Sequence, residues 1–197
     1  MVNIAQPNTL KPDYFDMVYA ANADPWGFET SDYERGKYAD TLRSLPRSAY
    51  KNVFEVGCSL GVLTAQLAPR CGTLLAVDGS EAPLVRARQL CGDLPNVRIQ
   101  QMQVPDQFPD GIFDLMVVSE VGYYWSPDDF REAQAAILQH LEPRGQLMLV
   151  HWTPPVHDYP LTGDEVHEAF LRLPGLVHLS GHREETYRLD VLERVAE

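Results

Sequence analysis

Two glycines and two carboxylates in the first half of the chain have the types and spacing of a ligand site. Gly57 and Gly61 lie in a turn directly after the apolar run 53–56, where glycine lets backbone approach a ligand closely. Glu55, just before the turn, would repel a pyrophosphate and attract an ammonium or sulfonium group. Asp78 ends the next apolar run, where a carboxylate can accept both ribose hydroxyls. The residues therefore favour a nucleoside cofactor that carries a positive charge.

The glycine spacing separates this turn from a dinucleotide-binding turn. Ser59 stands where the pattern G-x-G-x-x-G has its second glycine, so nicotinamide binding is disfavoured. S-adenosylmethionine, which carries both an ammonium and a sulfonium, fits the charge of Glu55. A structural alternative stays open, in which the glycines only permit tight packing of a strand on a helix and Asp78 caps a turn.

Aromatic and titratable residues follow the later apolar runs. Tyr123 and Tyr124 come directly after the run 113–119 and are expected to wall a substrate pocket, because aromatic faces stabilise cations. His151, at the end of the run 146–152, and Tyr159, in the proline-rich segment that follows, are the other candidates for substrate contact. Ordinary core packing is the alternative for these rings.

Three side chains are candidates for a general base. Glu120 follows Ser119 at the end of an apolar run, and His151 and His157 lie farther along the chain. Carboxylates and imidazoles accept protons near neutral pH when burial tunes their pKa values. Asp114 begins its run at the opposite end from the site, so we expect a structural role for it.

The elements that position these residues alternate in the manner of an α/β domain with a parallel sheet. Short apolar runs predict strands at 52–56, 73–78, 97–101, 113–119 and 146–152. Apolar residues at helical spacing predict helices at 61–68, 82–90, 128–141 and 162–173, with Ser80 and Ser126 as amino-terminal caps. Two closing strands, 176–182 and 186–194, are too close together for a crossover helix and should form an antiparallel pair.

Two further helices are predicted ahead of the sheet, at 12–22 and 31–45. We expect residues 1–48 to form a helical lid over the cofactor site and residues 49–197 to form the cofactor-binding part of the same single domain. The segment 1–11 lacks the charged and apolar regions of a signal peptide.

The composition of the chain limits the kinds of partner that it is expected to bind. The chain of 197 residues has 28 acidic and 16 basic residues, a formal net charge of -12, which disfavours nucleic acid. Cys58, Cys71 and Cys91 are odd in number and lack the spacing of a zinc site, so we expect no metal and reduced thiols in a cytoplasmic protein. No apolar run reaches the roughly 20 residues that span a bilayer. The sequence does not indicate the oligomeric state.

From Lys51 to the carboxyl terminus, the order of elements resembles a class I S-adenosylmethionine-dependent methyltransferase with a seven-stranded, mostly parallel, Rossmann-like sheet. The segments 24–26 (DPW), 33–38 (YERGKY) and 55–58 (EVGC) also resemble the rhizobial nodulation N-methyltransferases, which methylate a sugar amine on a chitin-like oligosaccharide.

The resemblance implies a set of cofactor contacts. The methionine part would lie against Glu55, Gly57 and Gly61, and the ribose against Asp78. Trp26 and Tyr33 would close over the cofactor, and Arg35 or Lys37 would pair with its carboxylate. The adenine would meet Met102 and a backbone N–H of Gln103 or Val104, where the superfamily's usual acidic residue is missing. The remaining predicted contacts are Cys58, Ser59, Gly79, Ser119 and Glu120.

These patterns predict a methyltransferase that acts on a small molecule, with an amine of a sugar or oligosaccharide as one acceptor. Two alternatives stay open: a cofactor-binding module without turnover, and a nicotinamide-dependent oxidoreductase.

Overall fold

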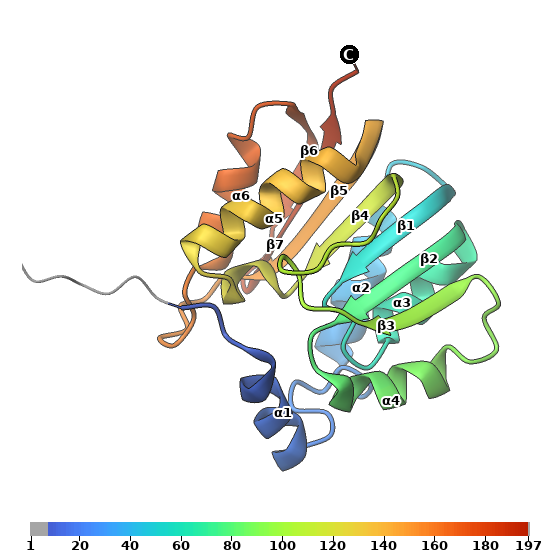
Figure 1. The fold of residues 1–197 in the computed structure, drawn as a ribbon, viewed down its shortest axis with the longest axis vertical. Coiled ribbons are helices and arrows are strands. Elements are labelled where there is room, and N and C mark those ends of the chain that lie inside the picture. Colours follow the sequence, from blue (N-terminus) through green and yellow to red (C-terminus); the bar gives the residue numbers. More distant parts are fainter. Residues whose placement is uncertain (1–7, 197) are drawn as a thin grey trace, which may run out of the picture.

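A single seven-stranded sheet forms the centre of the computed structural model, which describes residues 8–196 (Figure 1). Its strands lie in the order β3-β2-β1-β4-β5-β7-β6. Strands β1 to β5 pair in parallel, and β7 is antiparallel to both β5 and β6. The predicted parallel sheet with a final antiparallel pair is therefore confirmed. The strands are β1 Tyr50–Val56, β2 Cys71–Asp78, β3 Val97–Gln101, β4 Phe113–Ser119, β5 Leu141–Trp152, β6 Leu176–Arg183 and β7 Tyr187–Arg194.

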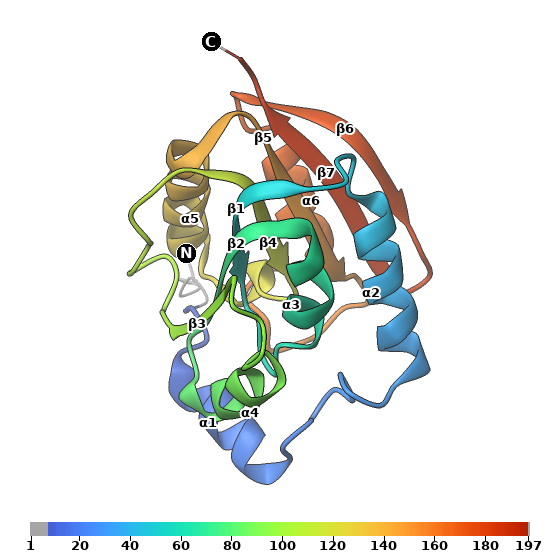
Figure 2. The same cartoon turned by 90° about the vertical axis from the view of Figure 1, so that its right-hand side faces the viewer.

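Helices cover both faces of the sheet. Helices α2 and α3 lie on one face and α5 on the other (Figure 2), and α6 packs beside α5 through Phe170 against Phe130. Helix α4 packs Leu84 and Ala87 on Ala76 of β2. The helices are α1 Pro12–Ala21, α2 Asp32–Ser44, α3 Val62–Leu67, α4 Glu81–Leu90, α5 Pro127–His140 and α6 Gly163–Leu171, with short 3-10 turns η1 Ala68–Arg70 and η2 Gly122–Tyr124.

Alternation along the central strands builds two cores. Val53 and Leu115 enter the core under α2 and α3, whereas Phe54 and Met116 enter the core under α5 and α6. A parallel sheet buried on both faces requires such continuous apolar strands. Because β1, β2, β4 and β5 are parallel, their carboxyl ends lie at one edge of the sheet, and the site residues lie at this edge.

One strand boundary and one of the two helix caps were predicted wrongly. Strand β5 begins at Leu141, directly after α5, and not at residue 146 as predicted; its pairing with β4 is irregular in this first part, where Arg144 has φ 64°. Ser126 caps α5 as predicted by accepting from the Asp129 N–H at 3.1 Å. Ser80 precedes α4 without a capping bond, because its hydroxyl binds Asp16 of α1 at 2.5 Å.

The predicted lid divides into two different parts. Helix α1 lies beside α4 at the carboxyl edge of the sheet (Figures 1 and 2). Helix α2 is part of a core layer, since Tyr38 and the following Leu45 are buried against β1. Residues 1–7 of the predicted lid lie outside the described residues. Among residues 8–196, no helix is both long and apolar enough to cross a membrane.

Candidate functional site

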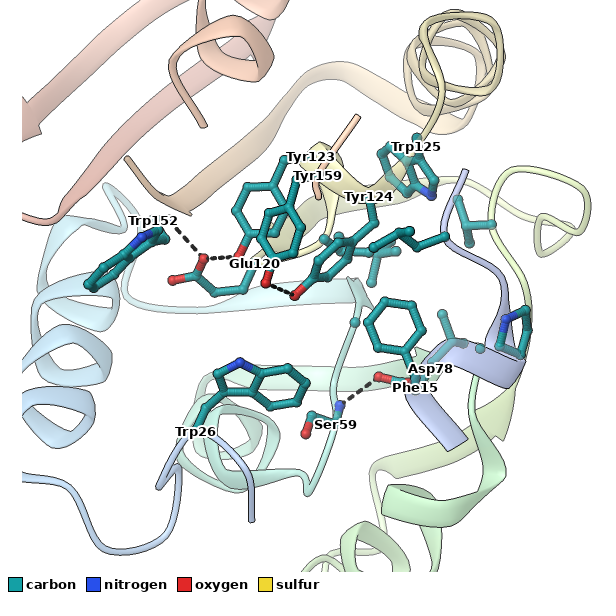
Figure 3. A pocket seen from close by; sticks show the side chains of 18 of the residues that line it. Phe15, Trp26, Ser59, Asp78, Glu120, Tyr123, Tyr124, Trp125, Trp152 and Tyr159 are labelled. Atoms are coloured by element: carbon teal, nitrogen blue, oxygen red, sulfur yellow. Dashed lines mark hydrogen bonds between the residues drawn. The ribbon is translucent and has the colours of Figure 1, made fainter. Parts of the chain in front are cut away.

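A cavity of about 430 Å³ opens at the carboxyl edge of the sheet. This volume is within the range of small-molecule sites, about 300–1,000 Å³. Figure 3 shows Asp78 and Phe15 toward one end and Glu120 and Trp152 toward the other, with Trp26 facing a group of tyrosines across the space. The cavity is therefore long enough in one direction to present two chemically different ends.

The turn after β1 forms part of the cavity wall. Gly57 lines the cavity at φ 81°, and a Cβ there would lie 3.1 Å from the Val121 Cβ. Ser59 also adopts the left-handed region, at φ 48°, although it is not glycine. Its N–H donates to Asp78 Oδ2 at 3.0 Å, so the turn is fixed to the end of β2.

Asp78 presents a partly buried carboxylate at its end of the cavity. Oδ1 accepts from the Ser80 N–H at 3.0 Å, and Oδ2 accepts from the Ser59 N–H. Because a carboxylate has about four lone-pair sites, acceptor capacity remains for ligand hydroxyls. Burial raises the pKa of Asp78 to about 6, so the group is mostly ionised at pH 7.

Three charged side chains form an ionic cluster at the opposite end. Lys37 Nζ lies 3.0 Å from Glu34 Oε1 and 2.6 Å from Glu120 Oε1. The side chains of Lys37 and Glu34 are 3% and 8% exposed, so these bonds form largely outside bulk solvent. The two carboxylates hold the pKa of Lys37 above its ordinary value despite burial, which lowers it. Lys37 is therefore a fixed cation, and the cluster as ionised carries one net negative charge.

Glu120 is held in a strained backbone conformation. Its φ is 56°, which costs a residue with a Cβ on the order of 1–3 kcal/mol. Oε2 accepts from the Trp152 N–H at 2.8 Å and from the Tyr123 hydroxyl, while Lys37 binds Oε1. Both oxygens thus have partners, and the strain places the carboxylate in the cavity wall.

Aromatic rings surround much of the space. Tyr123 and Tyr159 stack with centroids 5.0 Å apart, and Tyr124 meets Tyr159 edge to face at 4.8 Å. Trp26 packs against Tyr19 across the cavity's α1 side, with centroids 5.6 Å apart. These faces suit a ligand that carries positive charge.

Many of the residues predicted from the sequence line this cavity. They are Trp26, Tyr33, Lys37, Gly57, Ser59, Asp78, Gly79, Met102, Gln103, Val104, Glu120, Tyr123, Tyr124 and Tyr159. Their individual roles stay predictions.

Three predicted cofactor residues lie beneath the turn and do not line the cavity. Glu55 is 1% exposed, since its position in β1 alternates away from the cavity toward the core under α3. Cys58 packs with Leu84 in the small core under α4. A Cβ on Gly61, whose φ is 79°, would lie 3.0 Å from the Ala87 Cβ, so this glycine serves tight packing of helices. The structural alternative holds for Gly61.

The two histidine predictions and the prediction for Ser119 were also wrong in place. Ser119 ends β4 behind Gly57 and does not line the cavity. His151 is fully buried: Nε2 accepts from the Gly122 N–H at 3.1 Å, and Nδ1 lies 3.0 Å from His167 Nε2. His157 is fully exposed and lies beside Asp158. Neither histidine lines the cavity.

His151 belongs to a buried polar chain. His167 Nδ1 lies 2.6 Å from Asp190 Oδ2. Because His151 Nε2 accepts a hydrogen bond from the Gly122 N–H, its Nδ1 carries the ring hydrogen and donates to His167 Nε2. This chain supports the 3-10 turn that carries Tyr123.

Asp114 has the structural role expected for it, since its carboxylate accepts from the N–H groups of Lys51 and Asn52. The predicted pairing of Arg35 or Lys37 with a ligand carboxylate is not supported. Arg35 is exposed beside Asp32, and Lys37 already has two carboxylate partners.

The cavity also contains residues that sequence reasoning missed. The 3.6-residue spacing in α1 places Phe15 and Tyr19 on one face, which was a usable signal. Glu34 lies in the segment 33–38 that resembles the nodulation N-methyltransferases, but no local pattern indicated its contact with Lys37 and Glu120, because Glu120 lies far along the chain. The missed residues include Phe15, Tyr19, Phe28, Glu34, Val121 and Trp152.

Curated relatives share most of the chain's central region. Nodulation protein S of Rhizobium tropici is 32% identical over 127 residues, which are 64% of this chain and 53% of that protein. The dTDP-3-amino-3,4,6-trideoxy-alpha-D-glucopyranose N,N-dimethyltransferase of Streptomyces venezuelae is 27% identical over 142 residues, 71% of this chain and 56% of that protein. The chain spans about half the length of these two relatives.

Solved structures share the fold. A Pseudomonas syringae protein assigned to the methyltransferases is 38% identical, with a TM-score of 0.74 over 82% of this chain and 99% of its own. The N-methyltransferase NodS of Bradyrhizobium japonicum WM9, in complex with S-adenosyl-L-homocysteine, has a TM-score of 0.82 at 24% identity, over 93% and 97% of the two chains. The family model of Nodulation protein S (NodS) matches residues 16–152, and the chain belongs to that family.

Proposed function

We propose that this protein is an S-adenosylmethionine-dependent methyltransferase that methylates an amine of a small molecule. One observation carries the proposal: a single cavity has the partly buried carboxylate of Asp78 at one end and a negatively charged, aromatic-walled cluster around Glu120 at the other. The first end suits a ribose and the second suits a cationic group.

The described residues fit the proposed cofactor. Asp78 would accept the ribose hydroxyls, and Met102 would offer an apolar contact to the adenine beside the backbone of Gln103 and Val104. The missing Cβ at Gly57 keeps the space beside Val121 open. When bound, the cofactor supplies a methyl group on a positively charged sulfur. The protein's residues orient the acceptor and exclude water around it, which supplies much of the rate in such transfers.

An amino sugar is the acceptor that the relatives favour. The Streptomyces venezuelae relative is named for N-methylation of an amino sugar, and the Bradyrhizobium japonicum structure is an N-methyltransferase. Tyr123, Tyr124 and Tyr159 provide the kind of flat aromatic wall against which a sugar ring packs. The net charge of -12 also favours a cationic small molecule over a nucleic acid.

Two measurements test the function. Isothermal titration calorimetry should show binding of S-adenosylhomocysteine and no selective binding of NAD. Incubation with isotopically labelled S-adenosylmethionine and deacetylated chito-oligosaccharides, monomeric amino sugars and a metabolite extract should then give a labelled N-methyl product by mass spectrometry. Cofactor binding without transfer to any amine, hydroxyl or carboxyl acceptor would favour the module without turnover. Selective NAD binding would refute the proposal.

The location of this activity rests on the cysteines. Cys58, Cys71 and Cys91 are free thiols, and two of them are buried. From these thiols we infer a reducing compartment, the cytoplasm. Detection of the native protein in a cytoplasmic fraction tests this inference.

A further inference from the structure

Glu34 has an oxygen atom that nothing in the described structure satisfies. The residue is 6% exposed and lines the cavity, and its Oε1 accepts from Lys37 Nζ at 3.0 Å. Its Oε2 is buried and has no hydrogen-bond partner. An unpartnered buried acceptor costs about 1–3 kcal/mol, and more when it is charged. The cost is recovered if a bound ligand donates a hydrogen bond to Oε2.

The charge of the cluster defines what kind of ligand donates. Lys37 is shared between Glu34 and Glu120, so two carboxylates have one cation between them. The cluster would need one more positive charge to be neutral. A ligand with an ammonium group would supply both that charge and the hydrogen for Glu34 Oε2.

Glu120 is less suited to the same task. Its two oxygens are bound by Lys37, the Tyr123 hydroxyl and the Trp152 N–H. The acceptor sites of Glu120 are therefore already occupied by donors of the protein. Glu34 has a single donor, and burial raises its pKa above the ordinary value. The two carboxylates therefore differ in what they can offer a ligand: both oxygens of Glu120 are bound, whereas Glu34 has one buried oxygen without a partner.

Aromatic rings border the same position. The Tyr33 ring lies beneath Lys37 Nζ at 5.3 Å and meets the Trp152 ring edge to face with centroids 6.3 Å apart. Both rings line the cavity. Such rings stabilise a substituted ammonium, including one that gains a methyl group.

We propose that Glu34 binds the ammonium group of the methyl acceptor and removes its proton before transfer. This inference rests on the proposed function and names the residue that prepares the amine. The ammonium gives one proton to Glu34 Oε2, which leaves a neutral amine and a carboxylic acid. The nitrogen lone pair then forms the N–C bond, and the electron pair of the S–C bond stays on sulfur, giving S-adenosylhomocysteine and a methylated ammonium. Glu34 afterwards releases its proton to water.

Glu34→Gln tests this role with little change of shape. We expect kcat/KM for the acceptor amine to fall by roughly 10²-fold or more at pH 7, the usual contribution of a general base. The affinity for S-adenosylhomocysteine should stay within about two-fold of wild type. The loss should shrink as the pH rises above the pKa of the acceptor amine, because the amine then arrives neutral. Glu34→Asp, which keeps a carboxylate, should retain more activity than Glu34→Gln.

Asp32→Asn is the matched control, since it removes one negative charge from an exposed position in the first turn of the same helix. It should leave kcat/KM unchanged. The inference is overturned if Glu34→Gln keeps wild-type kcat/KM, if its loss is the same at every pH, or if the loss equals a loss of S-adenosylhomocysteine affinity. The last result would assign the carboxylate to the cofactor. A wild-type protein that methylates no amine would instead overturn the proposed function.

Discussion

Glu55→Gln gives a quantitative test of how burial in the sheet changes the pKa of Glu55, a carboxylate that the sequence analysis assigned to the cofactor. Glu55 is 1% exposed in β1, and its Oε2 has no hydrogen-bond partner. Burial raises its pKa from 4.5 to about 7. The folded protein therefore holds a proton at this site over a pH range in which the unfolded chain has lost it.

The sign and size of the pH dependence of stability follow from the linkage between protonation of Glu55 and folding. Because the folded pKa is raised, the favourable contribution of protonated Glu55 is complete below pH 4.5 and is lost as the pH rises through about 7. Each pH unit between the two pKa values is worth about 1.4 kcal/mol, so the full loss is about 3 kcal/mol. Between pH 5 and pH 8 the change is about 2–3 kcal/mol. Glutamine cannot ionise, so the variant has no such loss.

Urea unfolding of wild type and Glu55→Gln at pH 5, 6, 7 and 8 measures the difference. The free energy of unfolding of the variant, relative to wild type, should rise by about 2–3 kcal/mol across this range. A constant cost of burying the amide does not affect this slope. Glu132→Gln, at an exposed position on α5, should track wild type at every pH. Parallel curves for wild type and Glu55→Gln would refute the assignment of a raised pKa to burial.

Three other substitutions separate structural from functional residues. Lys37→Met leaves the buried carboxylate of Glu34 and the partly buried carboxylate of Glu120 without their cation, so it should destabilise by about 3–5 kcal/mol. Lys51→Met, at an exposed position, should not destabilise the protein, and equal melting temperatures of the two variants would contradict a buried ion cluster. Gly61→Ala places a Cβ against α4 on a residue in the left-handed region, so the variant should lose at least ~1–2 kcal/mol of stability in urea unfolding. It should keep its affinity for S-adenosylhomocysteine; a reduced affinity would indicate a direct cofactor role for Gly61. His151→Leu should cost about 1–3 kcal/mol per buried partner left unsatisfied, while His157→Leu should change neither stability nor methyl transfer; a loss of transfer in His157→Leu would restore it as a candidate base.

The fold was accessible to sequence reasoning because its signals are local. The run 53–56 is apolar at every position except Glu55, and a strand buried on both faces needs such a run. The short separation of 176–182 and 186–194 excluded a crossover helix, and the structure pairs them antiparallel. Cavity residues that directly follow strands, such as Asp78, Tyr123 and Tyr124, were placed correctly for the same reason.

The wrong predictions concern residues whose role depends on which way the side chain points from its strand. Glu55 lies next to the glycine turn in sequence, but alternation along β1 points it into the core under α3. His151 ends a strand as expected, yet its ring turns toward His167 on α6. The residues next to His151 in the sequence do not indicate that His167 is its partner, because α6 comes close to β5 only when the sheet and its helices are packed.

The sequence by itself determined the order of strands and helices, the turn with Gly57 and the edge of the sheet where ligand contacts gather. These follow from periodicity and from the rule that the carboxyl ends of parallel strands meet. Only the tertiary structure decided which carboxylates face the cavity. It buries Glu55, strains Glu120 into the wall and brings Glu34 from an amino-terminal helix to share Lys37 with it. The pairing joins residues 34 and 120, which are far apart in the chain, so only the packing of α2 against the sheet brings them together.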